Sequence, residues 1–229
     1  MDKPLKVIAH IKTDFATKFG VPRQSGLIDD LKATVIFEPE YRNPDAFRGL
    51  EGFSHIWLIW SFSQAVRERW LPTVRPPRLG GNSRIGVFAT RSPFRPNPIG
   101  ISSVRLDSII SDKEYGTVLI VSGADLMDNT PIYDIKPYLP FTDSHPDAKG
   151  GFADDKYSDG LDVAFSDELL CKIPQEKQAA VKAVLAQDPR PHYHDDPERV
   201  YGMNFAGFDI RFKVDNNLLT VCEVNCIKI

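Results

Sequence analysis

Glycine and proline interrupt the first 140 residues at short intervals and leave only brief apolar or β-branched runs between them. Short strands separated by turn residues are typical of barrels and sandwiches. No helical pattern alternates with these runs, and the dinucleotide fingerprint G-x-G-x-x-G is absent, so a doubly wound α/β fold is disfavoured. Strands are expected at 5–13, 33–37, 54–62, 86–90, 101–110, 117–121 and 131–139.

The last third of the chain has a different pattern. Residues 141–160 are rich in Asp, Gly, Ser and Lys, which predicts a linker or long loop. A helix is expected at 174–187, where Val181, Val184 and Leu185 form an apolar stripe. Strands are expected at 161–165, 208–214 and 218–224, and residues 215–217, Asp-Asn-Asn, predict a hairpin turn between the last two. The sequence therefore predicts a mainly β chain, with a β-barrel domain at 1–142 and a small α+β domain at 160–229.

Positive charge is concentrated in one segment. Residues 64–100 hold seven arginines and a single acidic residue, Glu68, so this segment carries +6 while the whole chain carries −3. Arginine suits a planar, bidentate grip on phosphate or carboxylate. Seven like charges in a solvated loop would repel one another unless an anion is bound. The segment therefore predicts anion binding.

A stiff loop lies at the end of that segment. Residues 86–100 contain Pro93, Pro96 and Pro98, which fix backbone angles and remove donors. Arg91 and Arg95 are therefore expected to be held in place, which lowers the entropy lost on binding. A rigid turn at 22–24, a Gly-containing stretch at 75–84 and a strand end at 122–131 are further candidate binding loops. Asp125 and Asp128, in the last of these, would either contact a ligand or cap a turn.

Other features set limits on function. The longest apolar run, 56–60, is far too short to span a membrane, and the first residues lack a signal-peptide pattern, so a cytoplasmic protein is expected. Cys171, Cys222 and Cys226 are expected to be reduced, partly buried thiols without a metal.

These motifs resemble the TsaA/TrmO-like proteins. The resemblance rests on segments 22–24, 48–55, 75–81, 86–100 and 134–138, with a further match at 186–191, and it covers nearly the whole chain. It implies a single-sheet β-barrel and a homodimer with the cofactor near the subunit interface. It also implies methyl transfer from S-adenosylmethionine to N6 of threonylcarbamoyladenosine at position 37 of tRNA.

The resemblance further implies which residues line the cofactor site. They come from five parts of the chain: Pro22, Arg23 and Gln24; Ser63 and Gln64; Arg91; Ile101; and Ser122, Gly123, Ala124 and Asp125. Their chemistry agrees with a zwitterionic ligand, since Arg91 or Arg23 suits its carboxylate and Asp125 its ribose or ammonium.

The remaining arginines are expected to contact tRNA phosphates. They are Arg69, Arg75, Arg78, Arg84, Arg95 and Arg190. A flipped base would need an aromatic partner, for which Phe94, Tyr133 and Tyr138 are candidates. The acylated target nitrogen is a poor nucleophile, so a proton acceptor is expected. The candidates are Asp125, Asp128, Tyr133, Asp134 and His55, although His55 on an apolar strand favours a satisfied core histidine.

Two other functions fit parts of the sequence. A non-catalytic RNA-binding barrel would use the arginine-rich segment alone and bind tRNA in a salt-sensitive way. A metal hydrolase would use His192, His194, Asp195 and Asp196, but this polar stretch offers no obvious fixed third ligand.

Overall fold

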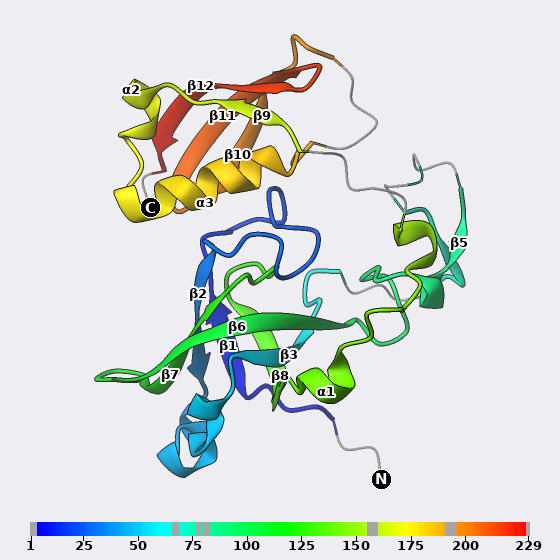
Figure 1. Ribbon diagram of the computed structural model, residues 1–229, viewed down its shortest axis with the longest axis vertical. Helices are drawn as coiled ribbons and strands as arrows, with labels where there is room; N and C mark the ends of the chain where they lie inside the picture. Colours follow the sequence, from blue (N-terminus) through cyan, green and yellow to red (C-terminus); the bar gives the residue numbers. More distant parts are fainter. Residues whose placement is uncertain are drawn as a thin grey trace.

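The computed structural model describes residues 4–65, 69–76, 79, 83–154, 160–190 and 196–227. Six strands close into an antiparallel barrel in the order β1-β2-β7-β6-β3-β8 (Figure 1). The bounds of these strands are Ala9–Lys12 (β1), Lys32–Phe37 (β2), His55–Ser61 (β3), Ile99–Asp112 (β6), Gly116–Ser122 (β7) and Thr130–Pro137 (β8). The predicted single-sheet barrel is therefore confirmed.

The interior of the barrel is filled by alternate side chains of its strands. In β3, Ile56, Leu58 and Trp60 are buried while their neighbours are more exposed, as period-2 alternation requires. They meet buried residues of the other strands, such as Ile11, Val35, Leu119 and Ile132. A barrel of this size is filled by its own side chains, so any ligand must bind at an end or on the outside.

A second sheet forms the C-terminal part. Its order is β10-β11-β12-β9, with β9 parallel to β12 and the other pairs antiparallel. One face is covered by α3, whose buried Val181 and Val184 pack into the core beneath it (Figure 1). The bounds are Asp162–Ala164 (β9), Tyr201–Phe205 (β10), Phe208–Asp215 (β11), Leu218–Cys226 (β12), Asp167–Leu170 (α2) and Gln175–Ala186 (α3).

The predicted helix and hairpin of this part are confirmed. Pro174 precedes α3 as its N-cap, where its missing N–H costs nothing. Asn216 has a φ of 51°, and β11 and β12 are joined directly across Asn216 and Asn217. Strand β10 was not expected, although Tyr201, Met203 and Phe205 are buried in alternation.

The three cysteines are exposed, contrary to the expectation of partly buried thiols. Two of them, Cys222 and Cys226, point away from the core face of β12.

Short elements connect the larger ones. A two-stranded arm, β4 (Thr73–Val74) with β5 (Ile85–Gly86), projects from the arginine-rich segment. The strand expected at 86–90 ends at Gly86, and the 3-10 helix Val87–Ala89 follows it. The other short helices are α1 (Pro140–Asp143) and 3-10 turns at Pro39–Tyr41, Pro44–Phe47, Leu50–Gly52 and Gly151–Ala153. Within the described part of the chain no helix is long and apolar enough to cross a membrane.

The segment between β1 and β2, residues 13–31, belongs to both halves. Its Phe15, Ile28 and Leu31 are buried in the core of the C-terminal sheet rather than inside the barrel. Phe15 meets Phe205 edge to face at 5.4 Å, and the Ala206 amide donates to the Asp14 carbonyl at 2.9 Å. The carboxylate of Asp14 also forms an ion pair with Lys177 of α3 at 2.6 Å. In Figure 1 this blue segment lies between the barrel and α3.

Candidate functional site

The candidate cofactor residues lie in loops at one end of the barrel. Because neighbouring strands are antiparallel, β1, β3 and β7 end where β2, β6 and β8 begin. The connections at this end are residues 13–31, 62–98 and 123–129. Every sequence-predicted cofactor residue falls in these connections or, like Ile101 and Ser122, close to the strand ends beside them.

Arg91 and Gln24 are the first contact of this site. The Arg91 guanidinium donates a hydrogen bond from Nη1 to Oε1 of Gln24. Gln24 in turn donates from Nε2 to the Arg23 carbonyl at 2.5 Å. The turn is tied to the β7–β8 loop by the Gly26 amide, which donates to the Gly123 carbonyl at 2.9 Å. Three separate loops therefore meet around one exposed guanidinium.

The loop that carries Arg91 is held by its own side chains as well as by prolines. Arg95 donates from Nη1 to the Thr90 carbonyl at 2.9 Å, and the Thr90 hydroxyl donates to the Val87 carbonyl at 2.9 Å. The Ser92 hydroxyl accepts from the Phe94 amide. This network orders the loop, as the proline pattern indicates. It also gives Arg95 hydrogen-bond partners within the chain, whereas an arginine that binds phosphate was expected to be exposed to solvent.

Asp125 is an acidic group within electrostatic reach of Arg91. Burial raises the pKa of the Asp125 carboxyl above its ordinary value, while a hydrogen bond from Ser102 and the positive charge of Arg91 act in the opposite direction. Ser102 Oγ lies 2.5 Å from Asp125 Oδ1, and the Ser25 backbone amide is a further partner. A half-buried carboxyl with a raised pKa beside an arginine is an arrangement suited to binding or proton transfer.

The other predicted cofactor residues differ in accessibility. Ser63 and Gln64 are exposed just beyond β3, and Ile101 on β6 is 50% exposed. Ser122, Gly123 and Ala124 are buried, so their side chains offer a ligand little surface. Pro22 is buried as well, and the Arg23 guanidinium turns towards the C-terminal half.

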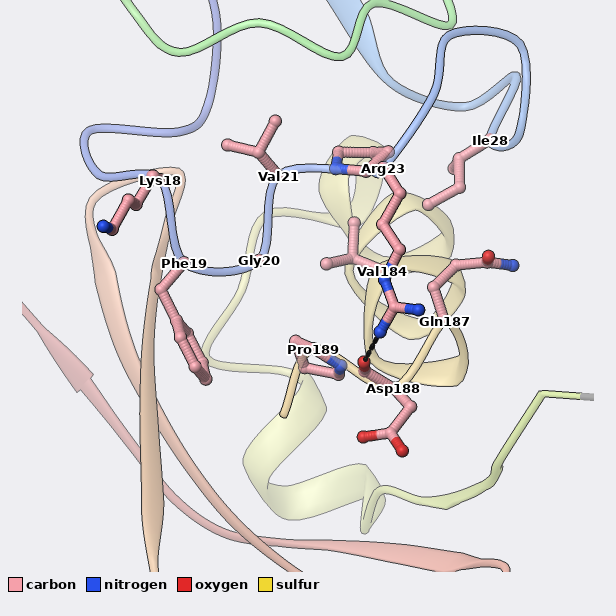
Figure 2. A pocket seen from close by; sticks show the side chains of 11 residues that line it. Lys18, Phe19, Gly20, Val21, Arg23, Ile28, Val184, Gln187, Asp188 and Pro189 are labelled. Carbon is pink, nitrogen blue, oxygen red and sulfur yellow. Dashed lines mark hydrogen bonds between the residues drawn. The ribbon is translucent and has the colours of Figure 1, made fainter. Parts of the chain in front are cut away.

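Arg23 lies in a small cleft between the two halves. The cleft encloses about 260 Å³ between the β1–β2 segment and the end of α3, and its lining includes Phe19, Val184 and Gln187. Figure 2 shows the Arg23 guanidinium crossing it to the Asp188 carbonyl, at 3.3 Å. Asp188 also binds Arg190, with Nε and Nη2 at 2.9 and 3.0 Å from its two carboxylate oxygens. Arg190 is thus largely buried in an ion pair, a setting different from that expected for a phosphate contact.

The remaining arginines expected to contact RNA lie on or beside the β4–β5 arm. Arg69, Arg75 and Arg84 are exposed. Arg75 follows Val74 and Arg84 precedes Ile85, and because these two residues pair, both arginines flank the arm at the same level. Arg78 lies outside the described residues. The arm therefore presents at least two guanidinium groups side by side to solvent.

Three of the other proton-acceptor candidates have structural contacts. Asp128 accepts the Thr13 amide at 3.0 Å, so it caps the end of β1. Asp134 accepts the Ile135 amide and pairs with Lys136 at 2.9 Å. His55 is exposed at the opposite end of the barrel, next to Tyr138, so the expectation of a core histidine was wrong. Tyr133 is partly buried on β8. Of the five, Asp125 is the one close to Arg91.

No group of three or more metal-binding side chains exists among the residues described here. Of the hypothetical metal site, His192, His194 and Asp195 lie outside them. The Asp196 carboxylate accepts the Glu198 amide at 3.0 Å and so shapes a turn.

Asp107 forms the strongest ion-pair cluster beside the site. It receives Lys32 Nζ at 2.8 Å, Arg105 Nε at 2.8 Å and the Ser122 hydroxyl. Burial by itself would raise the pKa of Asp107, but these three hydrogen bonds outweigh it and lower the pKa to about 2. The cluster joins β2, β6 and β7 where the β7–β8 loop begins, so it fixes the strand end that leads to Asp125.

Replacing Asp107 with Asn is expected to destabilise the fold by about 1–3 kcal/mol at neutral pH, because a charge-assisted cluster is lost. A lowered native pKa means that this contribution is present above the unfolded-state value near 4 and is lost as the pH falls through about 2. Urea denaturation at pH 7 and at steps down to pH 2 measures both effects. Asp45→Asn, which breaks an exposed pair with Arg48, is the control and should change little. Equal stability of wild type and Asp107→Asn at pH 7 would contradict the assignment.

Two residues of the site were not expected from the sequence. Trp60 donates a hydrogen bond to Ser102, and Ser102 donates one to Asp125, although neither Trp60 nor Ser102 stands in a recognisable motif. The period-2 alternation of β6 places Ser102 on the buried face with Gly100 and Val104. A buried serine on an otherwise apolar face was the available signal, because buried hydroxyl groups need partners.

The fold and site define a class of protein: a β-barrel, distinct from the doubly wound folds, with an arginine, an amide and a half-buried carboxyl in the loops at one end. Residues 10–144 match the tRNA-methyltransferase O N-terminal domain, and residues 158–227 match the TrmO C-terminal domain. The chain belongs to this tRNA-methyltransferase O family.

Individual relatives cover almost the whole chain. A protein of Escherichia coli called tRNA (adenine(37)-N6)-methyltransferase is 43% identical, over 90% of this chain and 91% of its own length. A Pseudomonas aeruginosa protein called putative S-adenosylmethionine-dependent methyltransferase RcsF is 38% identical over 98% of both chains. The crystal structure of TrmO from P. aeruginosa superposes with a TM-score of 0.80 at 34% identity, covering 99% of this chain and 98% of that one.

Proposed function

We propose that this chain methylates N6 of adenosine 37 in tRNA, with S-adenosylmethionine as the methyl donor. The observation that carries this proposal is the meeting of Arg91, Gln24 and Asp125 at one end of the barrel, in a chain that belongs to the tRNA-methyltransferase O family. The target is the adenosine that already carries a threonylcarbamoyl group.

The donor set of the site fits the cofactor's charges. Among the described residues, the hydrogen-bond acceptor of Arg91 is a neutral amide oxygen, that of Gln24, and a carboxylate is a stronger acceptor for a guanidinium. The methionine carboxylate of the cofactor therefore displaces Gln24 from Arg91. When bound, S-adenosylmethionine supplies the electrophilic methyl group, and the rigid loop around Arg91 fixes the line between that carbon and N6.

The tRNA contacts are assigned to the positive arm and the C-terminal sheet. Arg69, Arg75 and Arg84 are exposed, and adjacent guanidiniums suit successive phosphates. The functional unit is a cytoplasmic homodimer with the cofactor near the subunit interface. Exposed apolar residues next to the arginine segment, including Trp70, Leu71 and Phe88, support an assembly larger than one chain.

The direct test is methylation of purified tRNA with labelled S-adenosylmethionine, followed by mass spectrometry of the nucleosides. Methyl groups are expected only on tRNA that carries threonylcarbamoyladenosine, and tRNA with unmodified adenosine 37 is the matched control. Salt-sensitive binding of tRNA without transfer, and without affinity for the cofactor at millimolar concentration, would favour the non-catalytic RNA-binding barrel instead.

A further inference from the structure

A chain of buried hydrogen bonds ends at Asp125. Trp60 on β3 donates from Nε1 to Ser102 Oγ at 2.9 Å, and Ser102 Oγ lies 2.5 Å from Asp125 Oδ1. Ser102 is 1% exposed and Trp60 is 7% exposed. The three groups come from β3, β6 and the loop after β7, so the relay links neighbouring parts of the barrel wall to the site.

The direction of each hydrogen bond follows from chemistry. An indole N–H is only a donor, so Ser102 Oγ must accept from Trp60. The single proton of the Ser102 hydroxyl then points to Asp125 Oδ1, which accepts it. Because Oδ1 accepts the Ser102 hydrogen bond, the proton transfer is assigned below to the other oxygen, Oδ2.

The neighbouring sequence makes room for the indole. Gly100 pairs with Trp60 across β3 and β6, and a Cβ at Gly100 would lie 2.3 Å from Cε2 of the indole. No side chain fits at that distance, so only glycine lets the Trp60 ring lie flat over β6 and reach Ser102. Gly100, the last residue of the stretch 86–100, therefore shapes the barrel interior, while the rest of the stretch forms the loop that carries Arg91.

The surroundings of Asp125 have opposing effects on the pKa of its carboxyl group. Burial favours its neutral form, whereas the Ser102 hydroxyl, the Ser25 amide and the charge of Arg91 favour the carboxylate. Ser25 comes from the β1–β2 segment and Arg91 from the loop before β6, and Arg91 is the charged group that faces Asp125 from these elements. The net result is a pKa above the ordinary value of an aspartate, and a higher pKa makes a carboxylate a better proton acceptor.

We propose that Asp125 is the proton acceptor of the methyl transfer and that Ser102 and Trp60 are the positioning residues that present its Oδ2 to the substrate. The proposal rests on the proposed function. N6 forms a bond to the methyl carbon as the carbon–sulfur bond breaks, and that electron pair stays on sulfur. The proton of N6 passes to Asp125 Oδ2 and then to water.

The relay is tested first without catalysis, by following the indole N–H signals of the full chain by NMR as the pH changes. The Trp60 signal, assigned by its loss in Trp60→Phe, is expected to shift as Asp125 titrates. The shift should vanish in Asp125→Asn and in Ser102→Ala, and it should persist in Ser103→Ala, which removes an adjacent hydroxyl from the other face of β6. A Trp60 signal that is insensitive to the Asp125→Asn change would overturn the relay. The same spectra show whether each variant is folded.

The kinetic test measures the pH dependence of kcat. Loss of the Ser102 hydrogen bond is expected to raise the pKa of Asp125 further, so the acid limb of the profile moves to higher pH and kcat below it falls about tenfold. Trp60→Phe removes the hydrogen bond that the Ser102 hydroxyl accepts, so it should move the acid limb in the same direction but by a smaller amount. Ser103→Ala should leave the acid limb unchanged. An unchanged profile for Ser102→Ala in an active enzyme would refute the relay. A wild-type enzyme without methyl transfer would instead refute the proposed function.

Discussion

Replacing Arg91 with alanine is expected to weaken S-adenosylmethionine binding by about 100-fold or more and to remove methyl transfer at ordinary cofactor concentrations. The reason is the partner that is lost: truncating one side of a hydrogen-bonded charge pair costs about 2–5 kcal/mol. Arg91 is held by Gln24 and a proline-rich loop, so its guanidinium is positioned before the ligand arrives. Isothermal titration calorimetry with the purified chain measures the change.

Two matched variants make that result specific. Arg91→Lys keeps the charge but loses the planar fork, so an intermediate affinity is expected. Arg84→Ala removes an exposed arginine of the same segment and should leave cofactor binding intact while weakening tRNA binding and reducing its salt dependence. Wild-type affinity for the cofactor in Arg91→Ala would place the carboxylate site elsewhere.

Replacing Phe15 with alanine is expected to destabilise the whole chain by about 3–5 kcal/mol, as is usual for a buried aromatic residue. Phe15 is 1% exposed, packs edge to face on Phe205, and lies in a segment that starts from the barrel. Urea denaturation followed by circular dichroism measures the loss. A second effect is expected at the site, because the same segment carries Gln24 and Ser25, and cofactor affinity should fall in the folded variant.

Phe141→Ala is the control for that experiment. Phe141 belongs to α1 and is 87% exposed, so removing its ring should change neither stability nor cofactor affinity. If Phe15→Ala were as stable as Phe141→Ala, the proposed role of the β1–β2 segment as a shared core element would be wrong.

The sequence predicted the barrel because its strands alternate with clear turn signals. It also located helix α3 and the hairpin at Asn216, where local chemistry decides the structure. It failed where contacts are distant in the chain. Nothing local shows that Phe15 is buried under a sheet formed by residues after 160, or that Tyr201–Phe205 forms strand β10 of that sheet.

The candidate site was partly predictable for the same reason. Arg91 and Gln24 stand out because proline and glycine surround them, and the structure brings them together. Ser102 and Trp60 do not stand out, since a hydroxyl and an indole on strands acquire a role only when the barrel closes. Arg190 and Asp128 instead have partners within the chain: Arg190 pairs with Asp188, and Asp128 accepts the Thr13 amide, which is the capping alternative expected for it.

The β1–β2 segment has one more consequence, for how this protein can be divided. A fragment that ends after β8 would retain all six barrel strands, yet it would expose Phe15, Ile28 and Leu31, which share a hydrophobic core with the C-terminal sheet and helix α3. Those side chains would form a new apolar surface on the very stretch that carries Gln24. The barrel alone is therefore expected to self-associate and to lose its cofactor turn, so evolution can exchange the C-terminal half only together with residues 13–31.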